Sequence, residues 1–327
     1  SSAFGSNAFF GVINVVTRRA PDAQGMIATM EAGSLGQRGA SAQHGWSDGA
    51  GREALVAASH TRSDGGTLYF REFDTPETHG GIPRGLDDAV VARLFLKAAV
   101  GNTSFMLAHA TQTKGDPTAS YGQLFGDPRS EARDSRTIAD FGVPGVVSPE
   151  LEWSAHVFAG RYDYLGTYVY AEPPGPINYD RADARWAGIG VQAVYTGWSR
   201  HKVVVGFDGQ YDSRRDLANY DREPDATYLA HHGTNTHLGP FIQDEFAIRD
   251  DLRLSTGLRY DHTTVAGAEL SPRAALIYAP TARTTVKALV GSAYRGSAKG
   301  MTRGTILVGG DAGNEIGHSM RRGLVAI

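Results

Sequence analysis

The chain has 327 residues, and its 32 basic and 35 acidic side chains give a formal net charge of −3, which excludes the strongly cationic surface that binds nucleic acid. Its 41 glycines are scattered rather than periodic and cysteine is absent, so a collagen-like repeat, disulfide bonds and thiolate metal sites are excluded as well. No run comes near the roughly 18 apolar residues of a membrane-spanning helix, although a membrane-spanning β-barrel needs no such run.

The first segment with a readable pattern is FGSNAFFGVINVVTRRAP, residues 4–21. Gly5 and Gly11 allow a tight backbone, and residues 12–17 are β-branched apart from Asn14. This composition predicts a strand that ends at two arginines and a proline. The segment of residues 4–21 resembles the end of a domain more than the beginning of one.

Further along the chain, apolar and polar residues alternate with a period of two. The pattern is clearest in residues 89–100, 202–212, 252–262 and 284–294. In the first of these, Leu94 and Leu96 share one face of a strand, and Arg93 and Lys97 share the other. We expect roughly thirteen strands of about 10 to 14 residues, long enough for a tilted bilayer crossing of about 9 to 11 residues. The faces of residues 239–248 are mixed, and this strand is not oriented by its sequence.

The expected connections alternate between short and long. The short ones are residues 47–51, 101–102, 143–149, 199–200, 249–251 and 280–282. The long or medium ones are residues 63–88, 115–133, 171–182 and 214–233, with two short exceptions on the same side at 34–37 and 266–268. Short turns at one end of a meander and long loops at the other are typical of an outer-membrane barrel.

Three segments carry a resemblance to a known family. Residues 4–21 resemble the segment that closes the plug domain of TonB-dependent outer-membrane receptors, and the matching positions are Gly5, Asn7, Ala8, Gly11, Val12, Ile13, Asn14, Val15, Val16 and Thr17. Residues 239–262 and 270–298 resemble paired barrel strands of the same receptors, and the three segments occur in family order.

The resemblance implies an all-β fold: an antiparallel, up-and-down transmembrane β-barrel, with about 13 of 22 strands in this chain, preceded by the last strand of a plug. We therefore expect residues 1–20 to be the C-terminal remnant of a plug domain and residues 21–298 to form a partial barrel. The first barrel strand is expected near residues 26–33. Residues 299–327 leave the pattern and are expected to be an atypical tail of frameshifted or unrelated origin.

The resemblance also implies a function, which is TonB-dependent uptake of a scarce ligand across the outer membrane of a Gram-negative bacterium. The ligand class is a ferric siderophore or another metal chelate such as cobalamin, and the partners are outer-membrane lipid and the TonB complex. Two alternatives remain open at this point: a passive, porin-like channel and a soluble β interaction protein. No arrangement of catalytic residues stands out, so we expect no enzyme, and no cofactor is implied.

Candidate ligand-facing residues lie on the expected long loops, where aromatic and cationic side chains suit an anionic iron chelate. They are Tyr69, Arg71, Tyr121, Phe125, Arg129 and Tyr220. We expect no metal site, and the weak candidates for one are His231, His232 and His237. Aromatic residues near the expected strand ends, among them Trp46, Trp153 and Trp186, suit the girdles of a membrane barrel but are also common in any strand.

Overall fold

The computed structural model describes residues 15–170, 177–291, 305–307 and 324–326. The chain divides into two compact units. The larger unit comprises Val15–Val191 and Gly209–Asn235, and the described part of the smaller unit lies within Gln192–Asp208 and Thr236–Ile327. No helix of the described residues is long and apolar enough to cross a membrane.

The larger unit is an antiparallel meander in which each strand pairs with its neighbour along the chain. Its elements are η1 (Ala20–Ala23), β1 (Gly25–Ala32), β2 (Arg38–Ser47), β3 (Arg52–Ser63), η2 (Arg71–Phe73), η3 (Pro76–Gly81), β4 (Ala89–Val100), β5 (Thr103–Gly115), β6 (Glu131–Ser148), β7 (Leu151–Val169), most of β8 (Ile177–Tyr195), the second part of β9 (His201–Arg222) and β10 (Asp225–His231). Strand β10 folds back on β9 as a hairpin.

The smaller unit continues the same topology. Its strands are the first part of β9, β11 (Asn235–Arg249), β12 (Leu252–Thr263), β13 (Gly267–Thr281) and β14 (Thr284–Gly291), paired in that order. A separate parallel pair is formed by β15 (Thr305–Leu307) and β16 (Leu324–Ala326). The described residues thus carry β1 to β14 where roughly thirteen strands were expected, and the all-β antiparallel prediction is confirmed.

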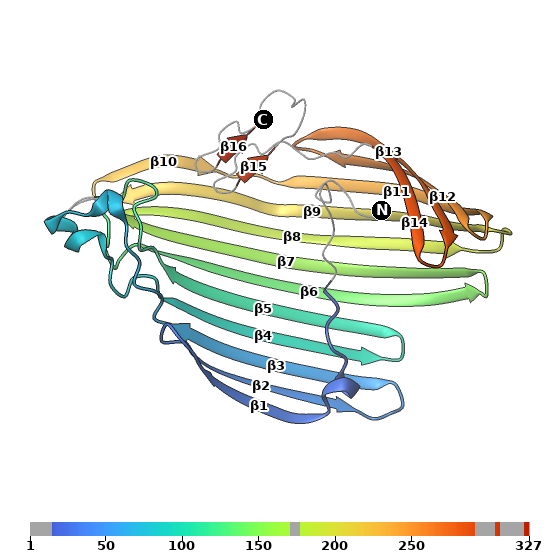
Figure 1. The fold of residues 1–327 in the computed structure, drawn as a ribbon, viewed down its shortest axis with the longest axis horizontal. Coiled ribbons are helices and arrows are strands. Elements are labelled where there is room, and N and C mark those ends of the chain that lie inside the picture. The colour runs from blue at the N-terminus through green and yellow to red at the C-terminus, as the bar shows by residue number, and fades with distance from the viewer. Residues whose placement is uncertain (1–14, 171–176, 292–304, 308–323, 327) are drawn as a thin grey trace. The chain divides into compact units, whose positions relative to one another are not determined.

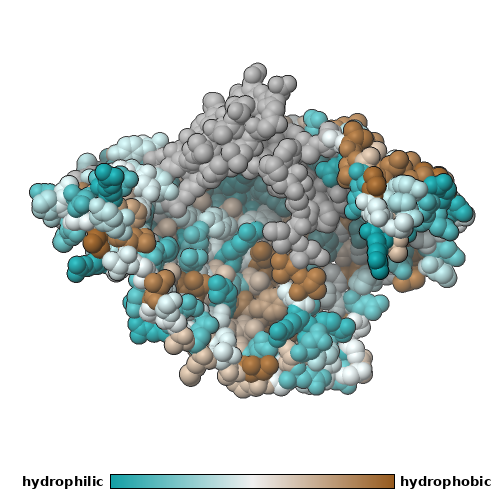
Figure 2. All heavy atoms as spheres, viewed as in Figure 1, coloured by the Kyte–Doolittle hydropathy of each residue, from teal (hydrophilic) through white to brown (hydrophobic). Residues whose placement is uncertain are grey.

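The alternation seen in the sequence gives the strands of the larger unit two different faces. On one face, Val56 of β3 and Leu107 of β5 lie opposite Leu96 of β4. On the other face, Ala57 lies opposite Phe95, which is flanked along β4 by the cation Lys97. We call the first the apolar face and the second the polar face. Figure 2 shows hydrophilic and hydrophobic residues intermixed on the face in view.

The ends of the strands in the larger unit also differ, as the sequence predicted. The connections 64–88 and 116–130 lie at one end, which we call the loop end, and 48–51, 101–102 and 149–150 lie at the other, the turn end (Figure 1). Trp46 and Trp153 lie on β2 and β7 next to these short turns, and both are exposed on the apolar face. This is the position of an interfacial aromatic girdle.

Three predicted connections are wrong in detail. Strand β6 runs to Ser148 and β8 begins at Ile177, so both connections are shorter than expected. Residues 214–233, expected as a loop, are mostly the hairpin of β9 and β10. Polar and apolar residues are mixed on both faces of these strands, so they lack the alternation by which strands were recognised.

Candidate functional site

At the loop end of the larger unit, two long connections are joined by aromatic stacking. The Phe73 ring, at the end of η2, stacks on Phe125 with a centroid distance of 4.3 Å and an interplanar angle of 12°. Phe70 meets the same ring edge-on at 5.7 Å. The Phe125 ring therefore packs connection 116–130 against connection 64–88.

Connection 116–130 is shaped by one buried amide. The side chain of Gln123 donates to the Asp116 carboxylate at 2.9 Å and to the Thr118 carbonyl oxygen at 3.2 Å, and it accepts from the Tyr121 amide at 2.9 Å. The backbone then joins the end of β7, because the Leu124 amide donates to the Val169 carbonyl at 2.7 Å. The connection is a built structure with its polar groups satisfied.

A buried polar network lies where β8 meets the β9–β10 hairpin. Asn178 and Asn219 exchange two hydrogen bonds of 2.9 and 2.7 Å, and Asn178 also donates to Asp221 at 2.8 Å. The Tyr228 hydroxyl donates to the other oxygen of Asp221 at 2.6 Å. Asn219 has no exposed surface. The network fixes the hairpin on β8.

The six predicted ligand-facing residues are not gathered into one pocket in the described structure. Tyr69 donates to Asp74 at 2.8 Å, and this hydrogen bond raises the pKa of Tyr69. Arg129 binds Asp127 through two nitrogens, which lowers the pKa of that carboxyl. Both side chains are thus held within their own connections.

The remaining three of these residues fall in different surroundings. The Tyr121 ring meets Tyr168 edge-on at 5.4 Å. Tyr220 lies in β9 and not in a loop, and it stacks on Tyr179 at 5.5 Å, on the opposite face of the hairpin from Asn219. Arg71 is exposed in η2, and its side chain has no hydrogen bond or ion pair within the described residues.

The three weak metal candidates do not form a cluster. His232 is paired with Asp216 at 3.1 Å in the larger unit, and His237 with Asp261 at 2.9 Å in the smaller unit. His231 ends β10. No group of three or more metal-binding side chains occurs among the described residues.

The segment before β1, which we call the linker (residues 15–24), is fixed on the polar face near the turn end. Lys97 of β4 donates to the Thr17 hydroxyl at 3.1 Å, and Arg19 pairs with Glu53 of β3 at 3.1 Å. Ala20 and Ala23 bury Leu55. Of the predicted plug motif, Val15 is exposed and Thr17 makes the contact just described, while Gly5, Asn7, Ala8, Gly11, Val12, Ile13 and Asn14 lie outside the described residues.

Glycine at position 45 makes this docking possible. A Cβ atom at Gly45 would overlap the carbonyl oxygen of Ala23, so the linker backbone lies directly on β2. Gln24 forms a bridge with the same glycine. The close approach is the reason why this position takes no side chain.

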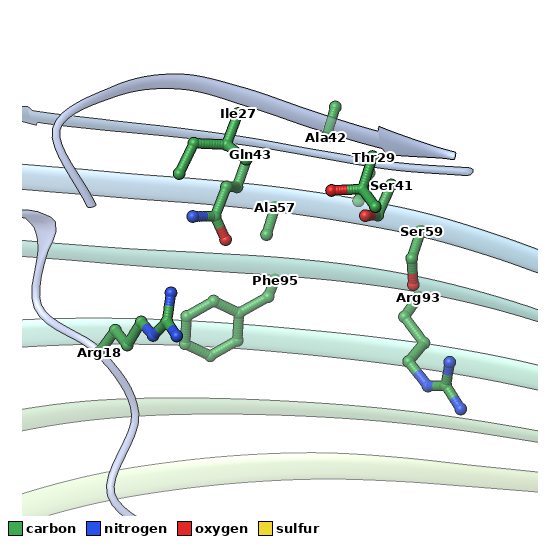
Figure 3. Close-up of a pocket in the computed structure, with 11 residues that line it drawn as sticks. Arg18, Ile27, Thr29, Ser41, Ala42, Gln43, Ala57, Ser59, Arg93 and Phe95 are labelled. Atoms are coloured by element: carbon green, nitrogen blue, oxygen red, sulfur yellow. The ribbon is translucent and has the colours of Figure 1, made fainter. Parts of the chain in front are cut away.

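A cavity of about 400 Å³ remains between the linker and the polar face of β1 to β4 (Figure 3). Its lining is Arg18, Ile27, Thr29, Ser41, Ala42, Gln43, Ala57, Ala58, Ser59, Arg93 and Phe95. The Arg18 guanidinium lies beside the Phe95 ring, and Arg93 lies at the other end of the cavity in Figure 3. The alternation of residues 89–100 predicts Arg93 on a polar face, but nothing in the sequence indicates a role for it.

Further along the polar face, the side chains bind one another. Tyr162 donates to Asp134, and the His156 ring nitrogen Nδ1 is 2.9 Å from an oxygen of Asp140. Trp186 lies flat over Gly160, where a Cβ would overlap its ring, with the Arg136 guanidinium 5.6 Å from the ring centroid. Trp186 is thus on the polar face, unlike Trp46 and Trp153.

The smaller unit contains a second buried charge network. Arg259 of β12 binds Asp208 of β9 at 2.8 Å and Asp261 at 3.0 Å, and its guanidinium lies 5.6 Å from the Phe241 ring centroid. Arg259 and Asp261 are nearly inaccessible to solvent. Both belong to the segment GLRYD that carried part of the resemblance. The structure explains the motif, because the arginine reaches from β12 across β11 to a carboxylate of β9.

Comparisons with known proteins agree on one family. The family model of the TonB-dependent receptor-like β-barrel matches residues 54–318. An iron-regulated outer membrane virulence protein of Vibrio cholerae is 30% identical over 95 residues, which are 29% of this chain and 14% of that protein.

Solved structures share the fold at low sequence identity. The ferric enterobactin receptor PfeA of Pseudomonas aeruginosa, in a mutant form, superposes with a TM-score of 0.66 at 13% identity, covering 89% of this chain and 47% of that one. The copper transporter OprC gives 0.63 at 16% identity, covering 85% and 47%. The ferric yersiniabactin receptor FyuA of Yersinia pestis gives 0.58 at 12%, covering 83% and 43%. This chain therefore spans about half the length of these structures.

Proposed function

Because this chain belongs to the family of TonB-dependent receptor-like β-barrels, we propose that it serves in the TonB-dependent uptake of a metal chelate across the outer membrane. Members of this family are outer-membrane proteins of Gram-negative bacteria, and they are receptors and transporters rather than enzymes. The observation that carries the proposal is the family match over residues 54–318, which includes β4 to β14.

In this proposal, each face and each end of the larger unit has a defined position relative to the membrane. The apolar face contacts lipid, and the polar face lines the interior of the barrel, as the alternation of residues in transmembrane barrels requires. The loop end is extracellular and the turn end is periplasmic, with Trp46 and Trp153 in the periplasmic girdle. A ligand would be captured at the loop end and released past the turn end.

The domain boundaries remain part of the proposal. We assign residues 1–20 to the end of a plug domain, residues 21–298 to part of the barrel and residues 299–327 to an atypical tail. The position of the linker supports the first assignment, since Thr17 and Arg19 are bound to the interior wall near the turn end. In this arrangement the linker would hold the barrel end of the plug while the TonB complex displaces the rest.

A ferric siderophore is the ligand class that we favour, with another metal chelate such as cobalamin as the second candidate. The names of the relatives support this choice, since two of the solved neighbours are ferric siderophore receptors. Among the predicted contact residues, Arg71 is the best placed, because it is exposed in η2 and its charge has no partner in the described structure. An anionic chelate would supply that partner.

Uptake assays in bacteria test the proposal. The receptor would be expressed in a strain that lacks its own siderophore receptors, and the accumulation of radioactive iron as siderophore complexes, or of labelled cobalamin, would be measured with and without TonB. We expect accumulation that requires TonB. Equal accumulation without TonB would contradict the proposal and favour a passive, porin-like channel, and absence of the protein from the outer membrane would favour a soluble β protein.

A matched pair of variants locates the ligand within this assay. Arg71→Ala removes the unpaired cation of η2, and we expect its apparent affinity for the chelate to fall by about tenfold, the effect of one lost charge-assisted contact. Arg38→Ala is the control, because Arg38 is also exposed at the loop end but is paired with Asp64 at 3.4 Å. Equal effects of the two substitutions would remove Arg71 from the binding site.

A further inference from the structure

We propose that the cavity between the linker and β1 to β4 is a binding site for a small polyanion, with a polycarboxylate as the favoured class. The site is separate from the loop-end connections, since it is bounded by the polar face of β1 to β4 on one side and by the linker on another, and is otherwise open. The proposal rests on the proposed function in one respect, which is that the cavity would lie on the route of an anionic chelate. Its chemistry follows from the residues alone.

The charge of the lining is entirely positive. Arg18 and Arg93 are the charged residues among those that line the cavity, and none of the lining residues is acidic. Within the described residues, neither arginine side chain forms a hydrogen bond or an ion pair, although the nearby cations Arg19 and Lys97 both do. Two unpaired guanidinium groups that face one cavity form an anion site, because each offers several donors in a fixed plane.

The neighbouring carboxylates do not neutralise these arginines. Glu53 is bound by Arg19 at 3.1 Å. Glu31, on the same face of β1 and nearer to the loop end, accepts a hydrogen bond from the Thr61 hydroxyl at 3.5 Å. Neither glutamate lines the cavity. The positive charge of Arg18 and Arg93 is therefore available to a ligand.

The remaining lining residues define the class of anion. Hydroxyl and amide groups of Thr29, Ser41, Gln43 and Ser59 supply neutral donors, and the Phe95 ring supplies an apolar surface (Figure 3). A volume of about 400 Å³ lies within the range of small-molecule pockets, about 300 to 1,000 Å³. Since the arginines are at opposite ends of the cavity in Figure 3, the ligand needs at least two separated anionic groups. A tricarboxylate meets this requirement, whereas a single carboxylate does not.

The site also depends on the position of the linker. Arg93 belongs to the rigid strand β4, but Arg18 belongs to the linker and lies between the two residues that bind it to the wall, Thr17 and Arg19. Displacement of the linker would remove one of the two cations and lower the affinity for the anion. The site therefore holds an anion while the linker is docked and releases it when the linker moves.

Anion binding to the purified full chain in detergent tests the inference. Isothermal titration calorimetry with citrate, acetate and inorganic phosphate would compare the unsubstituted chain with Arg93→Gln, Arg18→Gln and the double variant. We expect citrate to bind more tightly than acetate or phosphate, and each substitution to weaken citrate binding by about tenfold. Arg38→Gln is the matched control, since it removes a paired arginine outside the cavity, and its citrate affinity should be unchanged.

A backbone variant tests the role of the linker without touching either arginine. Gly45→Val places a side chain where the carbonyl oxygen of Ala23 lies, so the linker leaves the wall while Arg18 and Arg93 remain. We expect citrate affinity to fall about as far as in Arg18→Gln. Near-ultraviolet circular dichroism would show that the barrel is retained in each variant.

Several results would overturn the inference: no citrate binding to the unsubstituted chain, an unchanged affinity in Arg93→Gln and Arg18→Gln, or an equal loss in Arg38→Gln. Phosphate binding as tight as that of citrate would overturn the polycarboxylate assignment. Failure here is distinguishable from failure of the proposed function, because TonB-dependent chelate uptake does not require that the cavity bind citrate.

Discussion

Two regions of the polar face in the larger unit are built from similar sequence patterns and yet differ in chemistry. The first, on β1 to β4, carries small polar residues and the unpaired Arg93, and we call it the open wall. The second, on β6 to β8, contains the pairs Tyr162–Asp134 and His156–Asp140 and the stacked Trp186, and we call it the paired wall. Arg93 and Gln43 of the open wall have no partner within the described residues, whereas the named polar groups of the paired wall already bind each other.

The difference indicates which part of this surface is suited to bind a ligand. Satisfied polar groups add stability and hold neighbouring strands in register, but they offer little to a ligand, which would have to displace their existing hydrogen bonds. Arg18 and Arg93 are exposed and have no partner within the described residues, so an anionic ligand can bind them without displacing an existing hydrogen bond. We therefore expect substitutions in the paired wall to change stability and substitutions in the open wall to change binding.

The largest effect is expected from the buried network that continues the paired wall at the loop end. Asn219→Leu removes two hydrogen bonds with Asn178 and leaves that buried amide partly unsatisfied, which should cost about 2 to 3 kcal/mol in the free energy of unfolding. Urea unfolding in lipid vesicles would measure it. Gln43→Leu makes the same chemical change on the open wall, where no hydrogen bond of that side chain is found in the described residues, and should stay within about 0.5 kcal/mol. Equal costs for both variants would remove the distinction between the walls.

An intermediate effect is expected where the paired wall contains its flat aromatic contact. Gly160→Ala forces the Trp186 ring away from β7 and from Arg136, and overpacking of this kind costs about 1 to 3 kcal/mol. Thermal unfolding followed by near-ultraviolet circular dichroism would report both the stability and the ring environment. Gly142→Ala is the control on the same face, because the nearest atom to its Cβ would be the Ser104 hydroxyl at 3.3 Å. A destabilisation as large in Gly142→Ala as in Gly160→Ala would contradict the packing argument.

The smallest effect concerns the loop end of the open wall. Hydrogen bonds from the Lys114 ammonium and the Gly66 amide hold the pKa of Asp87 below its ordinary value of 3.8. Since the pKa is lowered in the folded state, the ion pair contributes stability above pH 3.8 and loses it as the pH falls through the lower, folded pKa. The contribution should be below about 1 kcal/mol, because both side chains are partly exposed.

Titration of the Asp87 carboxyl carbon by nuclear magnetic resonance would test this assignment. We expect a midpoint below 3.8 that moves upward in Lys114→Gln and stays in place in Lys202→Gln, which removes a lysine far along the chain. A midpoint at or above 3.8 in the unsubstituted protein would show that the ion pair is not formed in solution.

Much of the fold was predictable from local pattern, for reasons visible in particular strands. The alternation of Leu94 and Leu96 with Arg93 and Lys97 fixes the two faces of β4, and the short turn at residues 101–102 fixes its antiparallel pairing with β5. The hairpin of β9 and β10 was missed, because polar and apolar residues mixed on both faces give no signal of period two. The family motifs were recognised in sequence, and the family match bears them out for the barrel.

The candidate site was less predictable. Phe125 was expected to face a ligand. Its ring instead joins two connections by stacking on Phe73, which is distant in the sequence. Tyr220 was expected on a loop, but it stacks within a hairpin. In both cases the sequence gives an aromatic residue in a polar stretch, and a packed aromatic and a ligand contact look the same at that level.

The sequence by itself determined the meander, its two faces, its two ends and the family to which it belongs, because these depend on residue period and on short motifs. The tertiary structure alone decided which polar residues of the polar face pair and which remain unpaired. A period of two requires only that every second residue be polar or small, so Asp134 and Arg93 satisfy it equally. Their different roles arise because Tyr162 lies within reach of Asp134 on the neighbouring strand, whereas no carboxylate reaches Arg93 in the described structure.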